Sequence, residues 1–294
     1  MYFKGIRMKF LITGGAGNLG SGLANHLLQL DKNSQVVISD KFLTGSSANL
    51  PSQFGDRFQF ISADANSLPE MRAIFENNKF DIVFHYAAVV GVDRTLNDPI
   101  SVLNDIEGIK HILQLSLEND VSRIFYSSSS EVYGEPVEIP LNENTTPLNS
   151  KLPYAIVKNV GEAYFRSYQR TYGLDYTIMR FFNTYGPNQS DDFVIPRFVN
   201  KAKRNEDILI NGDGSQTRTF LYIDDNLEFI SKIIENNECV NQTVNVGSEE
   251  EITILELAEL VKKYTNSESK IVHRPALEEG DMTRRKPDNK LMRS

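Results

Sequence analysis

Tyr154 and Lys158 stand four residues apart in the segment PYAIVKN, within a stretch whose pattern predicts a helix. Side chains at this spacing lie on one helix face, so the phenol and the ammonium are neighbours. A free tyrosine titrates near a pH of about 10, and a nearby positive charge favours its phenolate. The pair can therefore act as a base near neutral pH if the rest of a site surrounds it.

A serine-rich segment, SSSSEVYG, covers residues 127–134 and directly follows an apolar stretch that predicts a strand. One interpretation is a flexible linker with a solvated Glu131. The other is a strand end that places Ser129 and Glu131 beside Tyr154, with Glu131 able to take a proton. The Tyr-x-x-x-Lys spacing downstream favours the second interpretation.

The first predicted strand leads into TGGAGNLG, which places Gly14, Gly17 and Gly20 at intervals of three before a helix. Such glycines let the backbone approach a pyrophosphate, whose charge is stabilised at the helix N-terminus. Asp40 ends the second predicted strand, twenty residues after Gly20. A carboxylate there binds ribose hydroxyls and repels a 2′-phosphate, so the sequence predicts NAD rather than NADP, although the neighbouring Lys41 is a cation.

Further cofactor contacts are expected where other strands end. Asp64, after the third strand, could hydrogen-bond the adenine or simply face water. Ala87 and Ala88, after the fourth strand, could leave room for a ligand or simply pack closely. We predict additional cofactor contacts at six positions: Asn18, Leu19, Asp64, Ala65, Ala87 and Ala88.

Apolar runs rich in β-branched residues alternate with helical patterns over the first 183 residues. The predicted strands are 8–13, 35–40, 57–64, 81–88, 121–129 and 174–183. The predicted helices are 21–30, 68–77, 100–118 and 154–172. The strands are apolar almost throughout, as expected where both faces of a sheet are covered. This alternation predicts an α/β fold of the Rossmann type, with a doubly wound parallel sheet.

After Asn183 the pattern changes to a helical stretch at 194–204, short strands around INGDGSQ and a helix at 254–264. This pattern predicts a smaller C-terminal lobe laid over the edge of the sheet. We expect a dinucleotide-binding domain at 8–181, to which 219–247 returns, and a substrate-binding lobe made of 182–218 and 248–294.

Taken together, the motifs resemble the extended short-chain dehydrogenase/reductase family, in its nucleotide-sugar epimerase/dehydratase group. The resemblance runs from about residue 8 to 288, nearly the whole chain. Nine segments carry it: TGGAGNLG, DKFLTGSSANL, ADANS, HYAA, YSSSSEVYG, PYAIVK, RFFNTYGP, NGDGSQTRTFLYIDD and RRKPD. The family implies retained NAD, a nucleotide-diphosphate sugar as substrate, and a homodimer that pairs through the helices at about 100–118 and 154–172.

The resemblance also implies a role for each matching residue. Ser129 matches the residue that hydrogen-bonds the sugar 4-hydroxyl, and Tyr154 matches the base that removes its proton. Lys158 matches the lysine that holds the nicotinamide ribose and lowers the tyrosine pKa. The family's substrate-binding residues correspond to three further positions: Asn183, Arg218 and Arg285.

The family's chemistry begins with oxidation of a hexose at C4, after which the ketone permits 4-epimerisation, loss of water, or loss of carbon dioxide from a C6 carboxylate. Glu131 matches a glutamate of dehydratases and decarboxylases, which favours a 4,6-dehydratase or a C6 decarboxylase. Ser130, however, stands where some dehydratases carry an aspartic acid. The alternative is a 4-epimerase of the UDP-glucose or UDP-GlcNAc type. A reductase that exchanges NADP(H) and a non-catalytic NAD-binding protein are less favoured, since Tyr154 and Lys158 are both present.

The overall composition favours a cytoplasmic protein, and the resemblance implies a role in carbohydrate biosynthesis. A net charge of −8 argues against binding to nucleic acid or to an acidic membrane surface. No segment approaches the roughly 20 apolar residues of a membrane span. Cys239 is the only cysteine, which excludes an internal disulfide, and the four histidines lack the spacing of metal ligands. The sequence therefore predicts no metal site.

Overall fold

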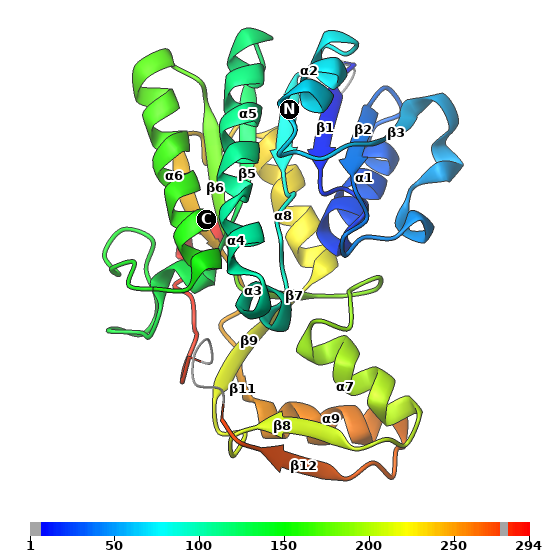
Figure 1. The fold of residues 1–294 in the computed structure, drawn as a ribbon, viewed down its shortest axis with the longest axis vertical. Coiled ribbons are helices and arrows are strands. Elements are labelled where there is room, and N and C mark those ends of the chain that lie inside the picture. The colour runs from blue at the N-terminus through cyan, green and yellow to red at the C-terminus, as the bar shows by residue number, and fades with distance from the viewer. Residues whose placement is uncertain (1–6, 277–281) are drawn as a thin grey trace.

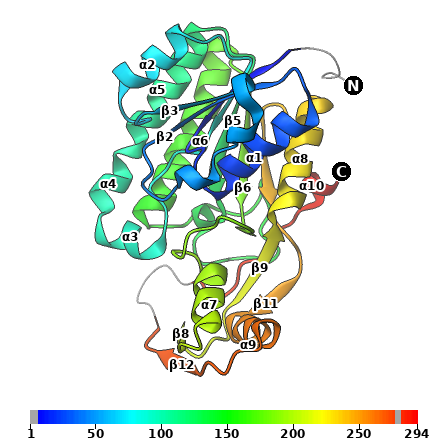
Figure 2. The ribbon, with the colours of Figure 1, turned by 90° about the vertical axis from the view of Figure 1, so that its right-hand side faces the viewer.

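A seven-stranded parallel sheet forms the middle layer of the computed structural model, which describes residues 7–276 and 282–294 (Figures 1 and 2). Its strand order is β10-β6-β5-β4-β1-β2-β3. The bounds are β1 Lys9–Thr13, β2 Gln35–Asp40, β3 Phe58–Ser62, β4 Ile82–His85, β5 Arg123–Ser129, β6 Tyr176–Phe181 and β10 Gln242–Val246. All neighbouring pairs are parallel, so the predicted doubly wound Rossmann-type sheet is confirmed.

Helices cover both faces of this sheet. One face carries α1 (Asn18–Leu30) and α8 (Ile223–Glu235), and the other carries α2 (Leu68–Glu76), α5 (Asp105–Glu118) and α6 (Pro153–Tyr172), as Figure 2 shows edge-on. Each face has its own apolar core between the sheet and the helices. This double cover explains why the strands are apolar throughout rather than alternating.

Two predicted elements are divided in the structure. The expected strand at 174–183 ends at Phe181. Phe182 makes the last backbone hydrogen bond to β10, with its N–H donating to Val246 O, and the chain then pairs with residues 220–222 in a second sheet as β7 (Asn183–Tyr185). The expected helix at 100–118 is interrupted at Asn104, which separates α4 (Pro99–Leu103) from α5. The other predicted elements are found with ends shifted by at most three residues.

The small lobe lies beyond the carboxyl ends of the sheet strands, at the bottom of Figure 1. Its three-stranded sheet has the order β11-β9-β7, and β12 pairs with β8 in a separate ribbon. An apolar core between these strands and two helices holds the lobe together. The bounds here are β8 Ile208–Asn211, β9 Thr217–Tyr222, β11 Glu251–Thr253, β12 Ile271–Arg274, α7 Val194–Lys203 and α9 Ile254–Thr265.

Short elements complete the chain, and the C-terminal segment returns from the lobe to the sheet. There, Leu141 N donates to Lys286 O and Asp288 N donates to Leu141 O, both at 2.8 Å. The remaining bounds are η1 Ser47–Asn49, η2 Ser52–Arg57, α3 Val92–Asn97, η3 Ser130–Tyr133 and α10 Lys290–Arg293.

Within residues 7–276 and 282–294, no helix is long and apolar enough to span a bilayer. In the same part of the chain, no group of three or more His, Cys, Asp or Glu side chains is arranged to hold a metal ion.

Candidate active site

One large cavity, of about 490 Å³, lies between the carboxyl ends of the sheet strands and the small lobe. This volume suits a bound small molecule. The residues predicted from the sequence all line it: Gly14, Gly17, Asn18, Leu19, Gly20, Asp40, Asp64, Ala65, Ala87, Ala88, Ser129, Glu131, Tyr154, Lys158, Asn183, Arg218 and Arg285. Segments far apart in the sequence therefore meet around one space.

The loop between β1 and α1 passes tightly against the end of β4. Gly14 has a φ of +68°, and a Cβ added there would lie 2.6 Å from the backbone N of Ala87. A Cβ at Gly20 would lie 2.6 Å from the loop's own backbone. Gly17 caps α1 without a side-chain hydrogen bond, which leaves first-turn N–H groups for an anion. The loop is thus a close-fitting cradle of the kind that a pyrophosphate requires.

Asp40 ends β2 beside this loop. Its carboxylate accepts hydrogen bonds from the N–H of Ala16 at 2.9 Å and of Phe42 at 2.7 Å. Lys41 Nζ lies 2.5 Å from Oδ2 of Asp64. The cation next to Asp40 is therefore already paired with a second carboxylate, an arrangement that suits ribose hydroxyls better than a 2′-phosphate.

Tyr154 and Lys158 project from the first two turns of α6, with Lys158 Nζ 5.6 Å from the centre of the Tyr154 ring. Burial is the largest influence on the pKa of Tyr154 and raises it, and the charge of Glu131 raises it further. A hydrogen bond with Ser129 acts in the opposite direction. The phenol therefore needs additional positive charge, such as that of an oxidised nicotinamide, to ionise near neutral pH.

Lys158 is almost completely buried, at 3 % exposure. Its Nζ lies 3.4 Å from Oγ of Ser127 and 5.2 Å from the ring centre of Tyr126. Burial lowers the pKa of Lys158 to about 8, against the opposing charge of Asp105. Since an ammonium has three donors, and Ser127 is the one hydrogen-bond partner found for it among the described residues, Lys158 can still donate to the hydroxyls of a ligand.

Glu131 and Arg285 form an ion pair just beyond the end of β5. Arg285 Nη1 lies 2.8 Å from Oε1 of Glu131, and the two side chains are 6 % and 19 % exposed. Within the described part of the chain, Oε2 of Glu131 and Nε of Arg285 are buried without a hydrogen-bond partner. Because buried polar atoms are normally satisfied, these two atoms offer a polar ligand one acceptor and one donor.

The tail that carries Arg285 is fixed on both sides of it. Arg284 makes a two-pronged ion pair with Glu251, with both N···O distances at 2.6 Å. On the other side, the carbonyl of Lys286 accepts from Leu141 N. These contacts bring the Arg285 guanidinium, from the last ten residues of the chain, to the end of β5.

Asn183 and Arg218 face the same cavity from the small lobe. Asn183 Nδ2 donates to Thr219 O at 3.1 Å, and Arg218 Nη1 donates to Met282 O at 2.8 Å. Backbone carbonyls therefore orient both side chains, which remain at the wall of the cavity.

Several polar residues that line the cavity escaped the sequence analysis, among them Ser127, Asp105 and Arg197. Ser127 is two residues before Ser129, and the two-residue period of a strand could have placed both on one face. Asp105 holds the loop after β4, since its Oδ2 accepts from Val89 N at 2.7 Å. Neither Asp105 nor Arg197 belongs to a recognisable motif, so their positions depend on the assembled fold.

The sequence model of the NAD dependent epimerase/dehydratase family matches residues 10–247. The chain belongs to this family. Its members named below are epimerases, dehydratases and decarboxylases, so this chain is an enzyme of the NAD-dependent epimerase/dehydratase family.

Relatives within the family act on different nucleotide sugars. A UDP-N-acetyl-alpha-D-glucosaminuronate decarboxylase of Bacillus cytotoxicus is 37% identical over 92% of this chain and 84% of its own. UDP-glucuronic acid decarboxylase 3 of Arabidopsis thaliana is 33% identical over 96% and 81%. A Streptomyces venezuelae dTDP-glucose 4,6-dehydratase with NAD and TYD bound superposes with a TM-score of 0.90 at 28% identity, covering 98% and 90%. A Thermotoga maritima UDP-glucose 4-epimerase with UDP-glucose gives 0.89 at 29% identity, covering 96% and 90%.

The residues of this epimerase/dehydratase family member fit NAD, the cofactor of the family. The Gly14 loop would hold the pyrophosphate, and Asp40 would hold the adenosine ribose. The unused donors of buried Lys158 would hold the ribose of the nicotinamide. When bound, NAD supplies a hydride acceptor next to Tyr154.

Proposed function

We propose that this chain decarboxylates a nucleotide-diphosphate uronic acid through a 4-keto intermediate and regenerates its NAD in each cycle. The observation that carries the proposal is the Arg285–Glu131 pair, because both residues line the cavity with Tyr154 and each has a buried polar atom without a hydrogen-bond partner among the described residues. A guanidinium in a water-poor site suits a carboxylate, because it binds in a forked, charge-assisted way.

The neighbouring residues favour loss of carbon dioxide over loss of water. Dehydration requires an acid that protonates the departing C6 hydroxyl, and Ser130 occupies the position at which an aspartic acid is expected for that role. A C4 ketone turns a C6 carboxylate into a β-keto acid, which loses carbon dioxide without such an acid. Arg285 then needs only to hold the carboxylate and let it leave.

Oxidation at C4 is assigned to residues of β5 and α6. Ser129 orients the 4-hydroxyl, and Tyr154 accepts its proton as the hydride departs. Lys158 supplies the positive charge that favours the phenolate. At the end of the cycle, Tyr154 returns the proton to the C4 oxygen.

The second step is assigned to Glu131 and Arg285. Arg285 binds the C6 carboxylate, and Glu131 takes up one proton from solvent to act as the acid of this step. The C5–C6 bond breaks, carbon dioxide leaves, and the electron pair passes to the C4 oxygen, where Tyr154 and Ser129 donate to the enolate. Glu131 then gives its proton to C5, so the step consumes one proton and releases one carbon dioxide.

Several named relatives support this choice of reaction, since two decarboxylases of UDP-linked uronic acids align with more than nine tenths of the chain. We assign NAD to the sheet, residues 8–181 with 219–247, and the nucleotide sugar to the lobe of 182–218 and 248–294. Asn183 and Arg218 would hold the sugar and the diphosphate. Action in the cytoplasm, in carbohydrate biosynthesis, is part of the same proposal.

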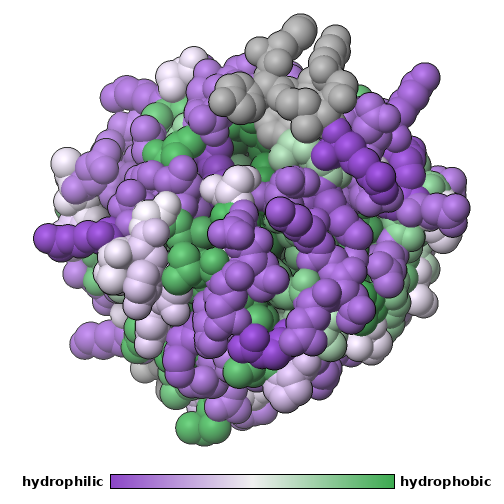
Figure 3. All heavy atoms as spheres, turned by 90° about the horizontal axis from the view of Figure 1, so that it is seen from above, coloured by the Kyte–Doolittle hydropathy of each residue, from purple (hydrophilic) through white to green (hydrophobic). Residues whose placement is uncertain are grey.

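We further propose a homodimer that pairs through α4 and α6. Large apolar side chains are exposed on these two adjacent helices, including Ile100 at 67 % and Ile156 at 39 %. In contrast, the end of the molecule opposite the small lobe is mostly hydrophilic, with apolar atoms in small separate groups (Figure 3). Apolar side chains exposed on two neighbouring helices suit burial against a second copy.

The deciding experiment is incubation with UDP-glucuronic acid and UDP-N-acetylglucosaminuronic acid, with UDP-glucose and dTDP-glucose as comparison substrates, read by mass spectrometry. Loss of carbon dioxide from a uronic acid is the expected result. Loss of water from dTDP-glucose, or unchanged mass with an inverted C4, would instead establish a dehydratase or an epimerase.

A further inference from the structure

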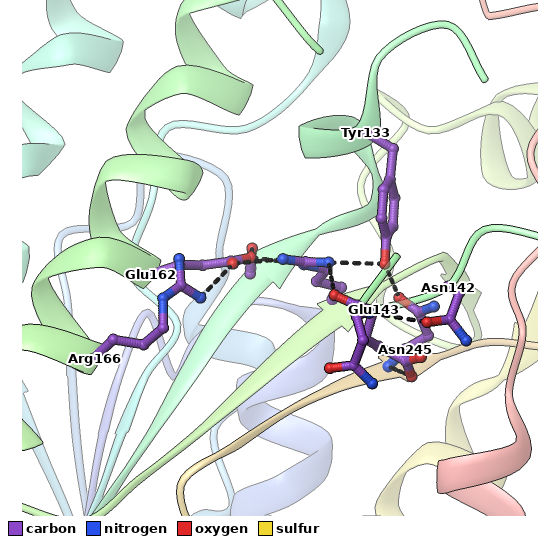
Figure 4. A network of polar contacts seen from close by, with 9 residues as sticks. Tyr133, Asn142, Glu143, Glu162, Arg166 and Asn245 are labelled. Carbon is purple, nitrogen blue, oxygen red and sulfur yellow. Dashed lines mark hydrogen bonds and ion pairs between the residues drawn. The ribbon is translucent and has the colours of Figure 1, made fainter. Parts of the chain in front are cut away.

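A buried polar network lies behind the cavity, outside the set of residues that the mechanism uses (Figure 4). Its centre is Arg180 of β6, which is 3 % exposed. Arg180 donates through Nε and Nη2 to the carboxylate of Glu162, at 2.8 and 2.7 Å, and Glu162 is completely buried. Ser128 Oγ donates to the same carboxylate at 2.6 Å. This half of the network ties α6 to β5 and β6.

The other half runs from Arg180 toward the C-terminal tail. Arg180 Nη1 donates to the hydroxyl of Tyr133 at 2.9 Å, and that hydroxyl donates to Oδ1 of Asn245 at 2.8 Å. Asn245 Nδ2 in turn donates to Leu141 O at 2.8 Å and to Asp288 O at 3.3 Å. Figure 4 shows Tyr133, Glu143 and Asn245 gathered at this end, with Glu162 at the other.

Each segment that the network joins carries part of the proposed catalytic set. Glu162 follows Lys158 by one helical turn on the same face of α6. Tyr133 belongs to η3, the same short helix as Glu131. Asp288 follows Arg285 by three residues in the tail. A continuous chain of hydrogen bonds therefore joins the segments that carry the oxidising residues to the segments that carry Glu131 and Arg285.

Overall stability alone does not account for such a network. Replacing a buried ion pair by apolar residues of similar size is often neutral or stabilising, so buried charge pairs are weak evidence of a stabilising role. What a fully satisfied polar network does provide is one defined arrangement of the segments that it connects. Here those segments must meet one sugar ring at C4, C5 and C6.

We infer that Arg180 and Tyr133 are positioning residues that hold the Glu131–Arg285 pair in register with Ser129, Tyr154 and Lys158, so that a ketone formed at C4 is processed before it escapes. The inference rests on the proposed two-step reaction. It assigns the Tyr133 hydroxyl, which lies outside the cavity lining, the task of coupling the two steps.

The test is Tyr133→Phe, which removes one hydroxyl and keeps the ring that packs against Phe182 and Leu141. Tyr264→Phe is the matched control, because Tyr264 is 78 % exposed on α9. The measured quantity is the ratio of released nucleotide 4-keto sugar, with or without its C6 carboxylate, to finished product. Both species come from the same folded molecules, so partial unfolding does not change this ratio.

We expect Tyr133→Phe to raise the ratio by about tenfold or more, since small misplacements of catalytic groups cost one to two orders of magnitude in rate. The Tyr264→Phe control should match the wild type. An unchanged ratio would overturn the inference, including the case in which the released 4-keto sugar and the finished product both fall by the same factor. The substrate assay on the wild-type protein tests the proposed function separately. If the wild type converts a different nucleotide sugar, the ratio of released 4-keto sugar to finished product is measured with that sugar.

Discussion

Nη1 of Arg285 lies 2.8 Å from Oε1 of Glu131, although 154 residues separate them in the chain. Glu131 comes from η3, directly after strand β5, and Arg285 comes from the C-terminal tail. Each keeps one buried polar atom free of hydrogen bonds among the described residues. The pair is thus a ready contact for a ligand that carries both an acceptor and a donor.

Glu131→Gln should uncouple the two steps at this pair. The amide keeps the size of the side chain but cannot return a proton to C5, so product formation should fall by about a hundredfold or more. Oxidation at C4, followed by absorbance of NADH in a single turnover, should remain measurable. Glu259→Gln, on the exposed face of α9, serves as the control. An unaffected rate of product formation would remove Glu131 from the mechanism.

Lys158→Met should stabilise the cofactor-free protein at pH 7. Burial lowers the pKa of Lys158 from 10.5 to about 8, so between these values the unfolded state binds more protons and stability rises with pH. At pH 7, removal of the buried charge should add up to about 3 kcal/mol to the free energy of unfolding. Denaturant titrations should show this advantage shrinking from pH 8 to pH 10. Lys263→Met, at an exposed position, should show no such trend.

Asp40→Ala should weaken retention of NAD. The carboxylate is held by the N–H groups of Ala16 and Phe42, ready for ribose hydroxyls, and hydrogen bonds to charged groups contribute about 1.5–3 kcal/mol each. The dissociation constant for NAD should therefore rise by at least about tenfold, and discrimination against NADP should decrease. Calorimetric titration of both cofactors measures this, with Asp56→Ala on the exposed η2 as control.

Gly14→Ala should be more damaging than Gly173→Ala. Both glycines have positive φ, +68° and +74°, so both alanines are strained, but a Cβ at Gly173 meets nothing within 4 Å. The Cβ at Gly14 would collide with the backbone of Ala87, which should cost about 1–3 kcal/mol more in stability and displace the loop. Thermal unfolding and NAD content of the purified variants give the comparison. If the two variants lose equal stability and retain equal NAD, the backbone near Ala87 must move to accommodate the added Cβ at residue 14.

Ile156→Glu should break the proposed dimer. Ile156 and Leu260 are equally exposed, at 39 %, on α6 and α9, so Leu260→Glu is a matched control away from the expected interface. A charge buried at the interface is costly without a partner, and the Ile156→Glu protein should sediment as a monomer. If both variants sediment like the wild type, the pairing face lies elsewhere.

The sequence allowed much of this architecture to be predicted, because local signals determine it. Continuous apolar strands, the glycine spacing and Asp40 indicated the sheet and the cofactor loop before the structure was known. The end of β6 at Phe181 was missed, since it depends on the pairing of Asn183 with Phe220 in a second sheet, more than thirty residues downstream. Only the family resemblance allowed Arg285 to be predicted as a site residue. Its contact with Glu131, and the hydrogen-bond partners of Arg180, depend on tertiary packing and could not be predicted from the sequence.

The edge strand β10 has a consequence for how the chain is made. Residues 242–246 pair with β6, yet they are synthesised only after β7, α7, β8, β9 and α8. During translation, the hydrogen-bonding edge of β6 therefore stays open until residues 182–246 have left the ribosome. The nascent sheet is exposed to wrong strand partners for that interval, and a chain cut after residue 181 keeps that exposed edge permanently.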